Sequence, residues 1–140
     1  MKRFMIASMV VLAFFFFYSS GTGVAGPLDP TPSQDKGIGP IKNVELGPLD
    51  QKLVSEGKAT FEATCVSCHS LDKRTVGPPL GKIAKEQTPE FIMNFLLNTT
   101  EMAQKDPIIK KLIADYGTIM PQPSINEKQA RAILEYLISL

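Results

Sequence analysis

The pentapeptide Cys65-Val66-Ser67-Cys68-His69 constrains this chain most, because it contains both of its cysteines and its only histidine. A thioredoxin-like dithiol needs C-x-x-C at the start of a helix in an α/β fold, whereas this pair follows an expected helix and no β-α-β pattern is present. Structural zinc commonly needs two cysteine pairs, or one pair with two histidines, which the chain lacks. Both interpretations are therefore disfavoured.

Covalent haem attachment is the third interpretation of C-x-x-C-H. Two thiols at this spacing can reach the two vinyl groups on one edge of a porphyrin, and the next side chain can then reach the iron. We therefore predict that Cys65 and Cys68 bind one haem c through thioethers and that His69 is an axial ligand of its iron. An export signal would support this prediction, because such attachment occurs outside the cytoplasm in bacteria.

Residues 1–25 have the features of a secretory signal peptide. Lys2 and Arg3 precede an apolar run from Met5 to Tyr18, and small residues follow up to Ala25. This order predicts cleavage after residue 25 and a periplasmic location. The alternative is an uncleaved anchor in the inner membrane, since Met5 to Ala25 spans 21 residues and a transmembrane helix needs about 20.

Residues 26–48 are rich in proline and glycine. The prolines are Pro27, Pro30, Pro32, Pro40 and Pro48. Proline removes a backbone donor and glycine raises backbone entropy, so we predict a linker or surface arm that is not a packed element. The folded domain is then expected to span residues 49–140.

The domain is predicted to be all-α, with roughly four to five helices. An apolar stripe at i, i+4 spacing precedes the pentapeptide and consists of Leu49, Leu53, Gly57, Phe61 and Cys65. Helices are also expected over residues 89–98 and 107–116, each opened by a proline, and from Asn126, which forms a capping box with Gln129. No strand-like alternation of useful length is present.

Several segments, taken in order, resemble the class I (monohaem) cytochrome c family. The resemblance covers residues 49–140. After the helix with Gly57 and Phe61 come CVSCH, then Gly77-Pro78-Pro79-Leu80, Ile119-Met120-Pro121, and Tyr136 in an L-x-Y-L setting. Each motif is weak alone, but their order is specific. The resemblance implies a cytochrome c fold packed around one covalently attached haem.

The resemblance also implies roles for individual residues. The Pro78 carbonyl would accept a hydrogen bond from Nδ1 of His69, which leaves Nε2 for iron. Pro79 and Leu80 would pack against the haem. Gly57 and Phe61 would meet the last helix near Ile133 and Tyr136. The chain departs from many relatives by having no tryptophan, so the usual propionate partner is missing.

Methionine is the expected sixth ligand, because a second histidine is absent. Met93 lies on an expected apolar helix, where packing explains it. Met102 follows a polar stretch that we interpret as a turn. Met120 lies before Pro121 in an extended loop that could cover the distal face of the haem, so we predict that Met120 ligates the iron.

These predictions favour an electron carrier over an enzyme. A haem ligated by both His69 and Met120 has no open position for a substrate, and both ligands can persist when one electron moves. The alternatives are a five-coordinate haem that binds a gas or performs catalysis, and a membrane-tethered cytochrome domain. Electron donors and acceptors such as a quinol–cytochrome c reductase and a terminal oxidase or reductase are the expected partners.

Charge gives little guidance about the partner. The net charge is +1, which provides no case for nucleic acid or for an anionic membrane surface. One alternative is a local basic rim near the G-P-P-L segment, formed by Lys73, Arg74, Lys82 and Lys85. An ordinary solvated surface is the favoured interpretation of these side chains.

Overall fold

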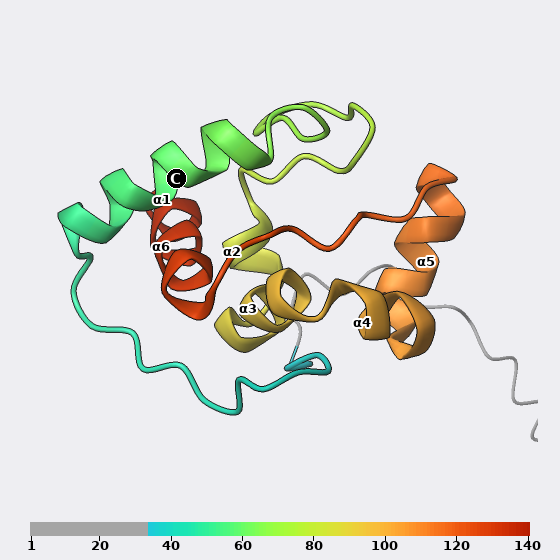
Figure 1. Ribbon diagram of the computed structural model, residues 1–140, viewed down its shortest axis with the longest axis horizontal. Coiled ribbons are helices and arrows are strands. Elements are labelled where there is room, and N and C mark those ends of the chain that lie inside the picture. The colour runs from blue at the N-terminus through green and yellow to red at the C-terminus, as the bar shows by residue number, and fades with distance from the viewer. Residues whose placement is uncertain (1–33) are drawn as a thin grey trace, which may run out of the picture.

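The computed structural model describes residues 34–140, which form six helices and no strand (Figure 1). The helices are α1 (Gln51–Thr64), α2 (Ile83–Glu86), α3 (Pro89–Leu97), α4 (Thr99–Lys105), α5 (Pro107–Tyr116) and α6 (Glu127–Ile138). The all-α prediction is confirmed. The expected four to five helices become six, because the short helix α2 was not predicted and α4 lies where the sequence predicts a turn. The predicted signal peptide lies outside the described residues.

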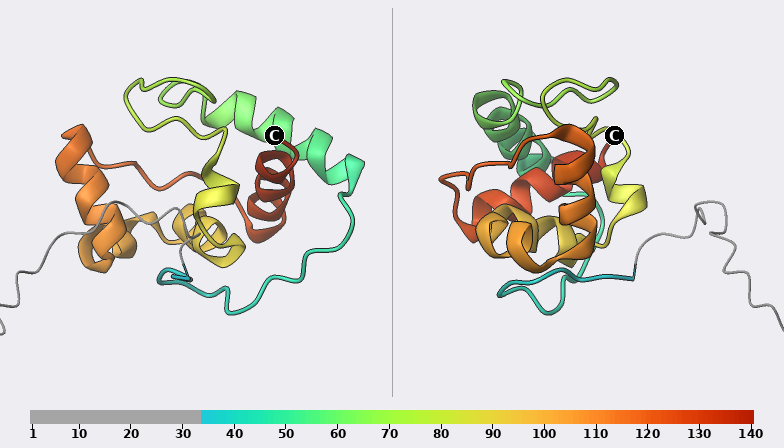
Figure 2. Two further views of the ribbon diagram at one scale, coloured as in Figure 1. Left: turned by 180° about the vertical axis from the view of Figure 1, so that it is seen from behind. Right: turned by 90° about the vertical axis from the view of Figure 1, so that its right-hand side faces the viewer.

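Helices α1 and α6 cross in contact, as two further views also show (Figure 2). At the crossing, a Cβ atom on Gly57 would collide with the backbone carbonyl of Ala132. The ring of Phe61 packs on that of Tyr136, with centroids 5.4 Å apart. Only a residue without a side chain permits this close approach, so the predicted contact of Gly57 and Phe61 with the last helix is confirmed.

Helices α3, α5 and α6 begin or end at capping residues. The Asn126 side chain accepts from the Gln129 N–H at 3.0 Å, and the Gln129 side chain accepts from the Asn126 N–H at 3.0 Å, which completes the predicted capping box. Thr88 caps α3 through its hydroxyl. Gly117 ends α5 in the left-handed region at φ 69°, where glycine carries no Cβ penalty.

Helix α4 (Thr99–Lys105) corrects the interpretation of the polar stretch before Met102 as a turn. Met102 is fully buried and forms a small apolar cluster with Phe91 of α3 and Ile109 of α5. Thr100, Gln104 and Lys105 are exposed on the outer side of this helix, and Lys105 forms an ion pair with Glu101 at 2.9 Å. Tertiary burial of one methionine therefore stabilises a helix that its local sequence did not suggest.

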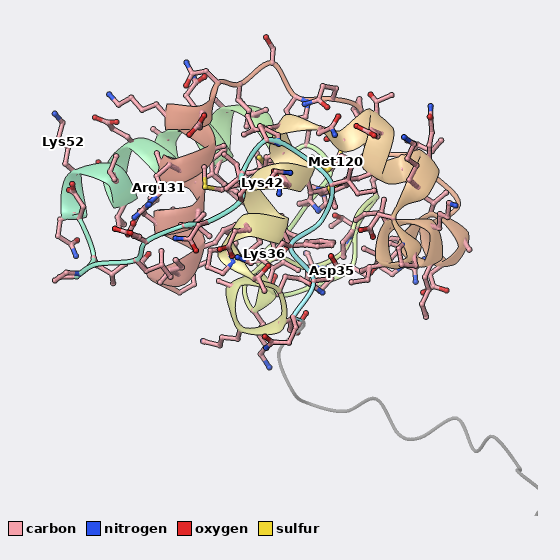
Figure 3. The ribbon with its side chains drawn as sticks, turned by 90° about the horizontal axis from the view of Figure 1, so that it is seen from below. Asp35, Lys36, Lys42, Lys52, Met120 and Arg131 are labelled. Carbon is pink, nitrogen blue, oxygen red and sulfur yellow. The ribbon has the colours of Figure 1, made fainter. Side chains whose placement is uncertain are left out.

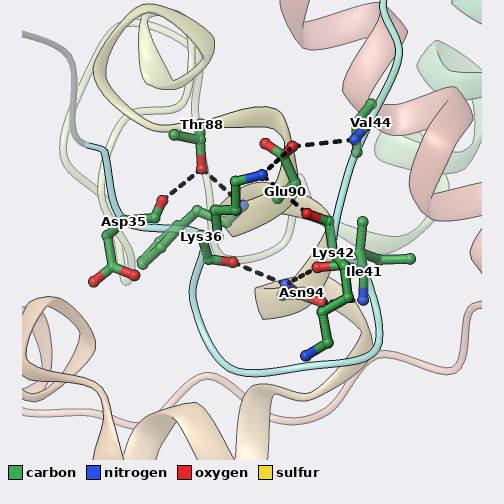
Figure 4. Close-up of polar contacts among 9 residues, drawn as sticks. Asp35, Lys36, Ile41, Lys42, Val44, Thr88, Glu90 and Asn94 are labelled. Atoms are coloured by element: carbon green, nitrogen blue, oxygen red, sulfur yellow. Dashed lines mark hydrogen bonds and ion pairs between the residues drawn. The ribbon is translucent and has the colours of Figure 1, made fainter.

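Residues 34–48, the N-terminal arm, have no helix or strand, but they pack against the domain (Figure 3). Ile41 joins the main apolar core. The Asn94 side chain bonds to the backbone of Ile41 and Lys36, and Glu90 accepts from the Val44 N–H at 3.1 Å (Figure 4). This finding differs from the expected unpacked linker. Buried polar side chains of α3 provide partners for an arm that cannot form its own secondary structure.

None of the helices within residues 34–140 combines the length and the apolar character needed to cross a bilayer.

Candidate haem-binding site

The cysteine pair lies directly after the C-terminal end of α1. The Cys65 N–H bonds to the Phe61 carbonyl at 2.8 Å, and the chain then turns, with the N–H groups of Cys68 and His69 both bonded to the Cys65 carbonyl at 3.1 and 2.9 Å. Both cysteines are half-buried and unpaired. This turn brings the two thiols and the histidine to one cavity, as the predicted haem attachment requires.

The His69 ring is held by the segment that follows it. Its Nδ1 lies 2.9 Å from the Pro78 carbonyl oxygen, which confirms the predicted hydrogen bond. The Gly77 N–H donates to the Cys68 carbonyl at 2.8 Å, and a Cβ on Gly77 would collide with the imidazole. A carbonyl oxygen can only accept a hydrogen bond, so Nδ1 is the donor in this contact and Nε2 remains available as a ligand atom.

The cavity beside His69 is lined almost entirely by apolar side chains. Four of the predicted residues besides the cysteines and His69 line it: Phe61, Pro78, Leu80 and Met120. Two lie elsewhere. Pro79 is exposed, which differs from the expected packing role, and Tyr136 is buried against Phe61 instead of lining the cavity.

Much of the lining comes from helices that we had not assigned to the site. These residues lie mainly on α3 and α5 and include Phe91, Phe95, Leu96, Ile109, Leu112, Ile113 and Tyr116. Their helical spacing signalled an apolar face, but an apolar face against another helix and one against a cofactor have the same pattern. The sequence therefore predicted that these side chains are buried, but not whether they pack against a helix or a cofactor.

Methionine placement separates the three candidate ligands. Met93 is buried in the main core, and Met102 is buried beneath the arm. Met120 is half-buried and lines the same cavity as His69. Of the methionines within residues 34–140, Met120 alone faces the space beside the histidine.

The alternatives for the cysteine pair fit this site poorly. Burial, with a smaller contribution from Cys68, raises the pKa of the Cys65 thiol, whereas a reactive dithiol requires a lowered pKa. Across residues 34–140, no three His, Cys, Asp or Glu side chains gather closely enough to hold a metal ion. The donor set instead consists of two thiols and one oriented imidazole on an apolar cavity, which fits a haem.

The fold and the site together define an all-α haem-binding cytochrome. The chain belongs to the cytochrome c family, whose model, described as "Cytochrome c", matches residues 54–140. This family binds covalently attached haem c, consistent with Cys65 and Cys68. Comparison with the curated proteins gave no match.

Solved structures of similar sequence have the same fold. A cytochrome c from Rhodothermus marinus is 44% identical, with a TM-score of 0.71 over 72% of this chain and 88% of that one. An engineered cytochrome c from the same organism is 43% identical, with a TM-score of 0.70 over 72% and 89%. A further engineered form, bound to a carbene intermediate, is 43% identical, with a TM-score of 0.67 over 72% and 88%.

Proposed function

We propose that this chain is a periplasmic electron carrier that exchanges single electrons through a haem ligated by His69 and Met120. The observation that supports the proposal most strongly is that these two side chains, from separate segments, line one apolar cavity together with both cysteines. Cys65 and Cys68 would hold the porphyrin edge as thioethers. A bound haem supplies an iron that can gain or lose one electron.

The protein's own residues then favour electron exchange over substrate chemistry. The Pro78 carbonyl orients the His69 imidazole through the 2.9 Å hydrogen bond. Met120 would fill the position where a substrate or gas could bind. A thioether ligand raises the reduction potential compared with a second histidine, and the apolar lining acts in the same direction because it disfavours the more charged oxidised form.

The cavity opening supports an apolar contact with the redox partner. Val76 and Ile119, which line the cavity, are 55% and 62% exposed. Arg74, one of the four residues of the basic rim considered above, is engaged by α5: it lies 3.9 Å over the Tyr116 ring and donates to the Asp115 carbonyl at 2.7 Å. We infer weak, transient docking through Val76 and Ile119 to a donor such as a quinol–cytochrome c reductase and an acceptor such as a terminal oxidase or reductase.

The near-infrared charge-transfer band of methionine-ligated ferric haem tests this proposal. The mature protein is expected to show the band, and Met120→Ala should lose it. Met93→Ala is the matched control, because Met93 is buried in the core and should leave the band in place. A wild-type ferric protein without the band would contradict His69/Met120 ligation and favour a five-coordinate haem that binds gases or substrates.

A further inference from the structure

Gln122 makes two hydrogen bonds across the break between α3 and α4. Its Oε1 accepts from the Thr99 N–H at 2.7 Å, and its Nε2 donates to the Leu96 carbonyl at 2.8 Å. Gln122 is two residues after Met120, in the segment that returns from α5 to α6 (Figure 1). One amide group therefore joins this segment to the end of one helix and the start of the next.

The α3–α4 break needs such a partner. Helix ends leave backbone donors and acceptors without intrahelical bonds, and Thr99 is fully buried, so an unpaired N–H there would be costly. Asn98, the residue before α4, does not cap it through its side chain, which bonds instead to the Ile38 carbonyl and to Glu101. Gln122 caps the start of α4 from 23 residues away.

The backbone between Met120 and Gln122 is stiff. Pro121 and Pro123 fix their own φ angles, and each restricts the residue before it. Between residues 34 and 140, the Ile125 N–H bonds to the Pro123 carbonyl at 3.0 Å within the local turn. The other hydrogen bonds described between residues 118–124 and the rest of the fold are the two made by Gln122. What holds the Gln122 amide therefore also determines where the Met120 backbone lies.

We propose that Gln122 is a positioning residue that holds Met120 over the cavity. The inference rests on the proposed ligation by Met120. Gln122 does not line the cavity, so it acts through the backbone and not by touching the haem. Loss of its two hydrogen bonds should free the segment, weaken the hold of Met120 on the iron, and let an external ligand compete.

The test compares haem-loaded Gln122→Ala with wild type by titrating the ferric protein with imidazole and following its absorbance. We expect Gln122→Ala to bind imidazole about tenfold more tightly, because the loss of two hydrogen bonds weakens the competing methionine. Gln104→Ala is the matched control, since Gln104 is an exposed glutamine on α4 with no hydrogen bond described for its side chain. It should bind imidazole as wild type does.

A second variant separates positioning from simple loss of stability. Gln122→Glu keeps an acceptor for the Thr99 N–H but cannot donate to the Leu96 carbonyl, so its imidazole affinity should fall between those of wild type and Gln122→Ala. A merely structural role would lower the melting temperature and leave imidazole affinity unchanged, which would overturn the inference. If the wild-type protein lacks the charge-transfer band, that result contradicts ligation by Met120 and, with it, this inference. If the band is present and imidazole affinity does not change in Gln122→Ala, only this inference is contradicted.

Discussion

The side chain of Asn94 pairs with the backbone of Ile41 as a neighbouring strand would. Its Oδ1 accepts from the Ile41 N–H at 2.8 Å, and its Nδ2 donates to the Ile41 carbonyl at 2.9 Å. The same Nδ2 donates to the Lys36 carbonyl at 2.8 Å. A Cβ on Gly39 would collide with this amide. One nearly inaccessible side chain thus holds the N-terminal arm on α3.

Replacing Asn94 with Ala should release the arm. The substitution leaves the buried N–H and carbonyl of Ile41 without partners, so we expect the free energy of unfolding to fall by about 2–3 kcal/mol. Chemical denaturation of the haem-loaded protein measures this change. Asn43→Ala, an exposed asparagine on the same arm, should change stability little. Equal stabilities for the two variants would contradict the structural role of Asn94.

Gly57→Ala should disrupt the crossing of α1 and α6. The new Cβ would collide with the Ala132 carbonyl, and backbone cannot move aside as a flexible side chain can. We expect a loss of roughly 2–4 kcal/mol, although alanine is the better helix former by about 1 kcal/mol. Thermal unfolding followed by circular dichroism provides the measurement. Gly47→Ala, where no atom lies within 4 Å of the new Cβ, is the control and should unfold at the wild-type temperature.

Most of the helices could be predicted because their signals are local. Thr88 before Pro89, and Asn126 three residues before Gln129, are complete signals within a few residues of sequence. The arm and α4 had no such signal. The arm depends on Asn94, whose partner Ile41 lies 53 residues earlier in the chain, and α4 depends on burial of Met102. Long-range partners of this kind leave no pattern in the local sequence.

The residues of the candidate site also divide into those with a local sequence signal and those without one. The C-x-x-C-H motif and the proline after Gly77 identified the cysteines, His69 and its hydrogen bond, because family motifs are contiguous. Gln122 was not predicted, because a glutamine between two prolines is typical of an ordinary loop. Its hydrogen bonds to Leu96 and Thr99 become evident only in the structure.

Acidification should loosen the arm through Glu90. Burial alone would raise the pKa of Glu90, but hydrogen bonds from its own N–H, the Val44 N–H and the Lys36 ammonium outweigh burial and lower it. A carboxyl whose pKa is lower in the folded state stabilises the fold above its unfolded pKa, and that stabilisation is lost as pH falls through the folded value. We therefore expect the free energy of unfolding to decline below about pH 4.5.

Glu90→Gln isolates this contribution. The variant should be less stable at pH 7, by about 1 kcal/mol, and its stability should depend less on pH in the acid range. Glu45→Gln, which changes an exposed acid of the arm itself, should retain the wild-type acid dependence. Parallel pH profiles for wild type and Glu90→Gln would show that Glu90 does not carry the effect.

Electron self-exchange between ferric and ferrous copies tests the apolar docking surface without a separate partner. NMR line broadening gives the rate. Ile119→Glu places a charge in the exposed apolar contact, so we expect the rate to fall about tenfold. Leu46→Glu, with similar exposure on the arm, should not slow it.

The same experiment measures any contribution of the basic rim. If docking is apolar, Lys82→Glu should change the rate by less than about twofold, and the rate should vary weakly with ionic strength. A strong salt dependence that Lys82→Glu abolishes would instead assign docking to the basic rim.

The haem-free chain should fold poorly, because the cofactor site occupies the centre of the apolar core. Phe61 and Leu80 line the cavity from one part of the chain, and Phe95 and Ile113 line it from α3 and α5. Without haem these side chains would face water or collapse on one another, and a domain of this size has only a small free energy of unfolding.

The double variant Cys65→Ala/Cys68→Ala should therefore lose its cooperative thermal transition, followed by far-UV circular dichroism. Ser67→Ala keeps both thiols within the same pentapeptide and should retain haem and the melt. A native-like helical spectrum with a cooperative transition in the double variant would mean that the α1–α6 crossing and the arm suffice to fold the chain.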